Sequence, residues 1–146
     1  MNIKVNIKRL NNDAILPSYG SEYAAGADLY SFSESFDIGA GETVLVHTGI
    51  AIELPIGYVG LVYARSGLAS KKGLAPANKV GVIDCDYRGE IMVALHNHSA
   101  SPQTVGVGER VAQMVFAPFY TAEPVEVDEL SDTVRGAGGF GSTGTK

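Results

Sequence analysis

Apolar and polar side chains alternate along much of this chain with a period of two residues. In the segment 43–54, TVLVHTGIAIEL, apolar residues recur at even-numbered positions, and in 90–96, EIMVALH, they recur at odd-numbered positions. Alternation of this kind is typical of strands with one buried face. Turn sequences that contain Gly and Pro, such as LPIGY and DYRGE, separate these segments. We therefore expect a fold built from short strands.

No segment sustains a helical period beyond a turn or two. The best candidate for a helix is 66–73, SGLASKKG, which starts with a serine that can cap it and ends on a glycine. A chain of 146 residues suits one domain. The pattern thus predicts an all-β sandwich, jelly roll or distorted barrel with one short helix.

Composition favours a soluble cytoplasmic protein. Hydrophobic residues make up 45% of the chain, and no apolar run approaches the roughly 20 residues of a membrane span. The segment 1–10, MNIKVNIKRL, lacks the apolar stretch of a signal peptide. The single cysteine, Cys85, excludes an intramolecular disulfide and suits a reducing compartment. We expect no membrane partner.

The charge distribution argues against binding to long nucleic acids. The formal net charge is -5, and the longest basic run is the pair KK at 71–72, so a groove that tracks a phosphate backbone is not expected. A small anionic ligand would need local arginines, backbone N–H groups or a divalent cation.

The segment 135–144, RGAGGFGSTG, is rich in glycine, a composition typical of a disordered tail. The spacing of its glycines matches a dinucleotide-binding fingerprint. That fingerprint needs a strand before it and a helix after it, and too few residues remain after the match for a helix, so we do not expect dinucleotide binding. A simple flexible tail does not explain Arg135 and Phe140. Arg135, backbone N–H groups and the hydroxyls of Ser142 and Thr143 are donors suited to phosphate.

The segment 81–90, GVIDCDYRGE, places two aspartates two residues apart. Asp84 directly follows an apolar run, and Asp86 points to the same side if the segment is extended. A carboxylate at the end of a buried strand is a candidate general base. An aspartate that stabilises the turn formed by DYRG explains the sequence equally well.

In the segment 63–69, YARSGLA, a predicted strand passes into the predicted helix. Arg65, Ser66 and the N–H of Gly67 can hold a phosphate there. The alternative is that Ser66 only caps the helix.

Two further polar residues lie among apolar neighbours. Asp28 lies in AAGADLYS, and Gln113 in RVAQMVF is expected on the strand face of Val111 and Val115. Polar groups on apolar faces need partners. A structural hydrogen bond is the simpler interpretation of each residue.

The motifs AGADLY, ARSGLA, GVIDCDYRGE, RVAQMVF and RGAGGFGSTG occur in this order over residues 24–144. Together they resemble the trimeric dUTPase family. The resemblance implies a jelly-roll-like distorted β-barrel over 1–134, assembled as a homotrimer. It also implies hydrolysis of dUTP to dUMP and pyrophosphate, which keeps uracil out of DNA and supplies dUMP for thymidylate synthesis.

The resemblance further implies a role for each motif. Asp84 would be the general base, the ring of Tyr87 would exclude a 2′-hydroxyl, and Asp28 would hold a water on Mg²⁺. The other implied substrate contacts are the uracil readers Asn78, Val82, Ile83 and Met92, the phosphate ligands Arg65, Ser66, Gly67 and Gln113, and the arm residues Arg135, Phe140, Gly141, Ser142 and Thr143.

The resemblance also implies that motifs from three subunits compose each site. The arm 135–146 is therefore expected to close over the site of a neighbouring subunit when substrate binds. A triphosphate with about four negative charges approaches an acidic protein, so Mg²⁺ is also an electrostatic requirement.

Two alternative functions stay open. A dCTP deaminase, or a bifunctional deaminase and triphosphatase, resembles this fold and motif order. The segment DCDYRG, with its tyrosine, resembles the triphosphatase and favours that function over the deaminase. A catalytically silent regulatory protein on the same scaffold is the other alternative.

Overall fold

The computed structural model of the protein describes residues 3–139. This part of the chain is almost entirely β-structure with one short helix, as the sequence predicts. The elements follow in the order β1 (Asn6–Arg9), β2 (Ser18–Tyr19), β3 (Ala27–Tyr30), β4 (Phe36–Ile38), β5 (Thr43–Glu53), β6 (Tyr58–Tyr63), α1 (Ser66–Lys72), β7 (Leu74–Pro76), β8 (Gly81–Ile83), β9 (Glu90–Asn97), β10 (Gln103–Val105) and β11 (Arg110–Pro118).

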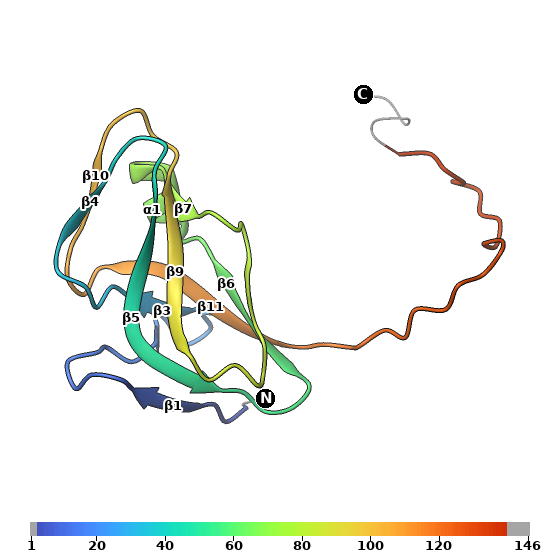
Figure 1. The fold of residues 1–146 in the computed structure, drawn as a ribbon, viewed down its shortest axis with the longest axis horizontal. Coiled ribbons are helices and arrows are strands. Elements are labelled where there is room, and N and C mark those ends of the chain that lie inside the picture. Colours follow the sequence, from blue (N-terminus) through green and yellow to red (C-terminus); the bar gives the residue numbers. More distant parts are fainter. Residues whose placement is uncertain (1–2, 140–146) are drawn as a thin grey trace.

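The strands form three antiparallel sheets. One sheet has the order β1-β5-β9-β7, a second has the order β2-β3-β11-β6-β8, and β10 pairs with β4. In Figure 1 the long strands β5 and β9 run side by side, with β11 and β6 behind them. One core lies between the layers, because apolar side chains from all three sheets are buried together. Its fully buried members include Leu29, Ile38, Val46, Ile91, Val93, Leu95, Val105, Val111 and Met114.

The alternation of the sequence predicts the buried face correctly in both long strands. Along β9 the odd-numbered residues from Ile91 to Leu95 are buried, and along β5 Val46, Ile50 and Ile52 are buried. The ladder between the two strands is irregular between His47 and Ala51. A bulge of this kind interrupts the period of two, so residues of both parities are buried from 48 to 52.

The predicted helix is present, but its start differs from the prediction. Arg65 occupies the N-cap position, and no side chain among residues 3–139 caps the helix. Ser66 is the first helical residue, so the interpretation of Ser66 as a helix cap is wrong. Gly73 ends the helix as predicted, with φ at 68° and its N–H bonded to Ala69. No helix in the described residues is long and apolar enough to cross a membrane.

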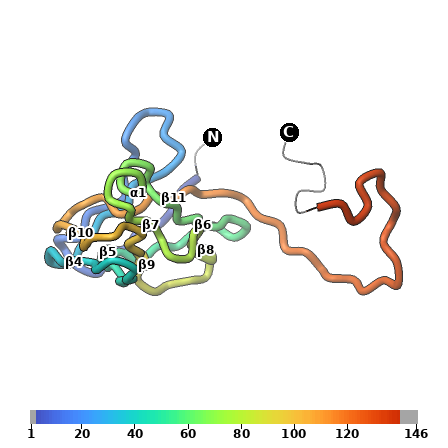
Figure 2. The backbone as a smooth tube through the Cα atoms, turned by 90° about the horizontal axis from the view of Figure 1, so that it is seen from above, coloured from blue at the N-terminus to red at the C-terminus, as the bar shows by residue number. Residues whose placement is uncertain are grey.

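After β11 the chain leaves the barrel. Residues 119–137 are exposed, and Figures 1 and 2 show this segment running away from the sheets. It carries exposed apolar side chains at Val125, Val127, Leu130 and Val134. The start of the predicted arm, 135–139, continues this segment. The predicted contacts Phe140, Gly141, Ser142 and Thr143 lie outside the described residues.

Candidate active site

A pocket of about 370 Å³ opens where β3, the start of α1 and β11 meet. Its wall contains most of the residues predicted to bind phosphate or metal, together with residues that the sequence analysis did not select. The lining residues are Gly20, Ala24, Gly26, Asp28, Arg65, Ser66, Gly67, Arg110 and Gln113.

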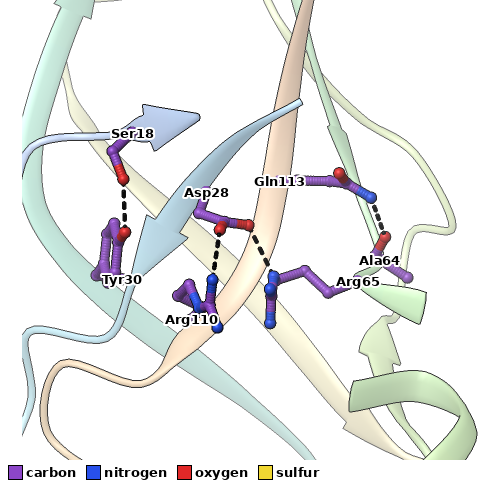
Figure 3. Close-up of polar contacts among 7 residues, drawn as sticks. All are labelled: Ser18, Asp28, Tyr30, Ala64, Arg65, Arg110 and Gln113. Carbon is purple, nitrogen blue, oxygen red and sulfur yellow. Dashed lines mark hydrogen bonds and ion pairs between the residues drawn. The ribbon is translucent and has the colours of Figure 1, made fainter. Parts of the chain in front are cut away.

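Asp28 connects two arginines at the wall of this pocket. Its Oδ1 accepts a hydrogen bond from Arg65 Nε at 2.7 Å, and its Oδ2 accepts one from Arg110 Nη1 at 3.2 Å (Figure 3). Asp28 is only 6% exposed, so a buried carboxylate here requires partners of this kind. Two guanidinium groups face one carboxylate. The pocket therefore keeps an excess positive charge that suits an anion.

Gln113 supports the same wall through its amide. Its Nε2 donates to the carbonyl of Ala64 at 2.9 Å, directly before Arg65 (Figure 3). Its Oε1 lies against Gly26, where a Cβ would clash with it. The structural interpretation of Gln113 and Asp28 is thus confirmed, and both side chains also line the pocket.

Ser66 and Gly67 bring the first turn of α1 to the pocket. The first N–H groups of a helix have no partner within it, and no side chain of the described part of the chain caps this end. A Cβ added to Gly67 would meet nothing within 4 Å. This end of the helix is therefore open to a ligand with hydrogen-bond acceptors.

The other predicted residues lie on β8 and β9, in the turn before β8 and in the β8–β9 loop, residues 84–89. In the described chain β8 pairs only with β6 and β9 pairs with β5 and β7, so β8 and β9 lie in different sheets. Val82, Tyr87 and Met92 are exposed there, although apolar and aromatic residues favour burial. Asn78 lies in the turn before β8, and its Nδ2 is 3.2 Å from the position of a Cβ on Gly81. β8 is the end strand of its sheet in the described chain. Its outer backbone edge is therefore open to a ligand.

Asp84 follows β8 and is exposed. Its backbone carbonyl accepts a hydrogen bond from the N–H of Tyr87 at 3.2 Å, which closes the turn. Within residues 3–139 its carboxylate makes no hydrogen bond, so the side chain does not stabilise the turn. A carboxylate of this kind is free to accept a proton from a bound water.

Glu90, the first residue of β9, attaches the end of the β8–β9 loop to β5. Its Oε1 accepts a hydrogen bond from the N–H of Gly49 at 2.8 Å, and its Oε2 lies 2.8 Å from His47 Nδ1. Partial burial opposes ionisation of this carboxyl. The hydrogen bonds from His47 and Gly49 outweigh that effect and lower the pKa of Glu90 below its usual value.

The phosphate pocket and the β8–β9 loop lie apart within one chain. β6 and β8 are antiparallel, with Gly60 paired to Ile83 and Val62 paired to Gly81. Asp84 therefore lies beside the start of β6, one residue beyond Gly60, whereas Arg65 follows the end of β6, five residues after Gly60. At about 3.3 Å per residue, these six steps separate the two backbone positions by roughly 20 Å along β6. The structure thus groups the predicted residues into two clusters rather than one.

Arg110 is the pocket residue that sequence reasoning missed. In a regular strand Arg110 and Gln113 point to opposite faces, because their positions differ by an odd number. The register of β11 against β3 shifts between Arg110 and Ala112, and this bulge brings both side chains to the pocket. The same bulge separates Gln113 from Val111, so the expectation that these two share a strand face is wrong. Val111 is fully buried, whereas Gln113 and Val115 are both partly buried.

The described residues form no metal-binding group of their own. They contain no cluster of three or more His, Cys, Asp or Glu side chains. Asp28 is the one carboxylate among the described lining residues, and both of its oxygens accept from arginines. Its remaining lone pairs fit a contact to a metal through water, and a cation here would need further ligands from a bound anion.

The barrel and its arginine-lined pocket define a protein that binds a small phosphorylated ligand. The dUTPase family profile matches residues 12–144. The deoxyuridine 5'-triphosphate nucleotidohydrolase of Nautilia profundicola is 51% identical over 142 residues, which cover 97% of this chain and 99% of the relative. The chain belongs to the dUTPase family.

Solved structures of phage dUTPases have the same fold. The Staphylococcus bacteriophage 80alpha dUTPase with dUPNHPP superposes with a TM-score of 0.89 at 29% identity, covering 98% of this chain and 99% of that one. A mutant dUTPase from phage phi11 of S. aureus, described with a structural Mg(II) ion, gives a TM-score of 0.79 at 25% identity, covering 87% and 98%. The predicted jelly-roll-like β-barrel is thereby confirmed.

Proposed function

We propose that the chain carries out the reaction of its family, the hydrolysis of dUTP to dUMP and pyrophosphate, at a site made from its two clusters. The carrying observation is the pairing of Arg65 and Arg110 through Asp28 beside the open first turn of α1. This arrangement offers preorganised positive charge and N–H donors to a triphosphate.

Asp84 acts as the general base in this proposal. Its exposed carboxylate accepts a proton from a water, and the water oxygen forms a bond to the α-phosphorus. The bond from the α-phosphorus to the bridging oxygen breaks, and pyrophosphate leaves with the electron pair. Arg65, Arg110 and Gln113 bind the phosphate oxygens and hold the triphosphate in line for the attack.

The β8–β9 loop and the ends of β8 and β9 beside it bind the nucleoside. The open backbone edge of Val82 to Asp84, with Asn78 and Met92 beside it, reads the uracil. A backbone edge that donates to O4 of uracil sets donor against donor when cytosine presents its amino group. The exposed ring of Tyr87 lies under the deoxyribose and leaves no room for a 2′-hydroxyl.

Mg²⁺ is the proposed cofactor, held mainly by the phosphates of the substrate. Asp28 would hold it through a water, since it is the carboxylate of the described pocket. When bound, the ion neutralises part of the triphosphate charge. A phage phi11 dUTPase mutant described with a structural Mg(II) ion is an example of a protein of this fold that binds magnesium.

A homotrimer in which neighbouring subunits share each site brings the two clusters together. Asp84 lies roughly 20 Å from Arg65 within one chain, too far for both to act on one α-phosphorus. A neighbouring subunit that places its β8–β9 loop beside this pocket closes the distance. The cytoplasm is the proposed compartment, which suits the free thiol of Cys85.

The extended segment 119–134 supports an arm that crosses to a neighbour. It alternates exposed apolar residues with acidic ones and contains no Lys or Arg. An apolar groove of about 800 Å³ lies between β1 and the second sheet, with Lys8 on β1 and Lys4 just before this strand. Among the described residues β1 is an edge strand. We propose that the groove and edge of one subunit receive this segment from another, which brings 135–146 over the site.

Pyrophosphate release from dUTP, dCTP, dTTP and UTP, with and without Mg²⁺, tests the function. We expect release from dUTP with Mg²⁺, and a kcat/KM for each other nucleotide that is lower by roughly 10²-fold or more. Ammonia released from dCTP would indicate a deaminase. Tight dUTP binding without pyrophosphate release would indicate a silent regulatory protein.

A further inference from the structure

The ring of Tyr87 is held by contacts with the β8–β9 loop and with the first residue of β9. Its hydroxyl donates a hydrogen bond to the carbonyl of Glu90 at 3.0 Å. The ring also lies directly against Gly89, where a Cβ would come within 2.6 Å of Tyr87 Cζ and 3.0 Å of Cε2. The backbone of Gly89 is not in the left-handed region, so contact with the ring, rather than backbone conformation, requires glycine there.

The acceptor of the Tyr87 hydroxyl is itself held in place. Glu90 pairs with Ala51 in the ladder between β5 and β9, and its carboxylate accepts from the N–H of Gly49. The Tyr87 hydroxyl is thus tied, through Glu90, to the longest strand of the barrel.

Arg88 fixes the other end of the tyrosine, its main chain. Nη1 donates to the carbonyl of Cys85 at 2.8 Å and to the carbonyl of Tyr87 at 3.1 Å. Nη2 donates to Glu53 Oε1 at 3.3 Å, and Glu53 Oε2 accepts from Asn6 Nδ2 at 2.9 Å. The turn that follows Asp84 is therefore connected to the end of β5 and to β1.

The ion pair between Arg88 and Glu53 is exposed, so its main effect is on the position of the turn rather than on the stability of the fold. The Arg88 and Glu53 side chains are 54% and 51% exposed. Exposed ion pairs contribute little to the free energy of unfolding. The bonds to two main-chain carbonyls act on the shape of the turn instead.

We propose that Arg88 and Gly89 are positioning residues for sugar discrimination. Gly89 lets the Tyr87 ring lie close to the backbone of the β8–β9 loop, and Arg88 fixes the main chain from which the ring projects. Exclusion of a 2′-hydroxyl works only if the excluding ring cannot yield, because a shift of about 1 Å already changes a packed contact. This inference rests on the proposed role of Tyr87 under the deoxyribose.

The test is the ratio of kcat/KM for dUTP to kcat/KM for UTP. In Gly89→Ala the new Cβ displaces the ring, and the barrel stays folded because the ring can rotate away. We expect the ratio to fall about tenfold in Gly89→Ala and roughly threefold in Arg88→Ala, mainly because UTP is used better. Arg88→Lys, which keeps the charge but loses the fork, should give an intermediate ratio.

Gly106→Ala is the matched control, since its Cβ would meet only Glu109 Oε2, at 3.8 Å. We expect its ratio to equal that of the unmodified protein. A merely structural role for Arg88 and Gly89 would lower kcat for both nucleotides equally and leave the ratio unchanged, which overturns the inference. If Gly89→Ala does not fold, the ratio of Arg88→Ala decides in the same way.

Tyr87→Ala, measured in parallel, separates the inference from the function on which it rests. If Tyr87→Ala admits UTP while Arg88→Ala and Gly89→Ala do not, the inference fails and the role of Tyr87 stands. If Tyr87→Ala still rejects UTP, the role of Tyr87 fails and the inference fails with it. Hydrolysis of dUTP by the unmodified protein is independent of either result.

Discussion

Asp84→Asn is expected to lower the turnover of dUTP by roughly 10²- to 10⁴-fold, the usual scale for loss of a general base. Asparagine has nearly the same shape as aspartate but cannot accept the proton of the attacking water. The Asp84 carboxylate is exposed and makes no hydrogen bond within residues 3–139. The substitution should therefore leave the fold and the affinity for nucleotide nearly unchanged.

Steady-state kcat and the Kd of a non-hydrolysable dUTP analogue measure the two quantities separately. Asp86→Asn is the matched control, because Asp86 is an exposed aspartate of the same turn. We expect near-normal turnover in this control. A near-normal rate in Asp84→Asn would remove Asp84 from the role of general base, and a large rise in Kd would indicate a binding role instead.

Removal of residues 135–146 is expected to lower kcat/KM for dUTP by roughly 10²-fold or more, since stacking of a base on an aromatic ring alone contributes about 1–3 kcal/mol. The deleted segment carries Phe140, whose ring we expect to stack on the uracil, and Arg135, which we expect to bind a phosphate. The last strand of the barrel ends at Pro118, so the deletion leaves every described strand and the helix in place.

The truncated protein should keep its oligomeric mass and thermal midpoint, measured by light scattering and calorimetry. Phe140→Leu in the full chain is the companion variant, because it retains apolar volume and loses the aromatic face. Full activity after truncation would contradict the role of the arm. Unfolding or dissociation after truncation would show that 135–146 is structural.

The period-two pattern was enough to predict the strands, because burial of one face leaves a local signature in the sequence. Ile91, Val93 and Leu95 are buried as their spacing predicts. Bulges leave no such signature, since they depend on how two distant strands pair. Because of the bulge between Arg110 and Ala112, the sequence pattern did not reveal Arg110 as a pocket residue and wrongly placed Gln113 on the face of Val111.

The partners of polar residues were also beyond the reach of local patterns. Asp28 and Gln113 could be recognised as polar groups in need of partners. The bonds of Asp28 to Arg65 and Arg110 join segments that are far apart in the chain. Only the folded sheet brings them together, and the same holds for the contact of Arg88 with Glu53.

Hybrid oligomers of Asp84→Asn and Arg65→Ala chains test the central claim, a site built from two chains, most directly. Each variant alone should be nearly inactive. In an equal mixture refolded together, about a quarter of the sites would combine an intact Arg65 from one chain with an intact Asp84 from another, if each site takes the two residues from different subunits. We predict that pyrophosphate release rises toward a quarter of the unmodified rate. A mixture no more active than the separate variants would contradict the shared site.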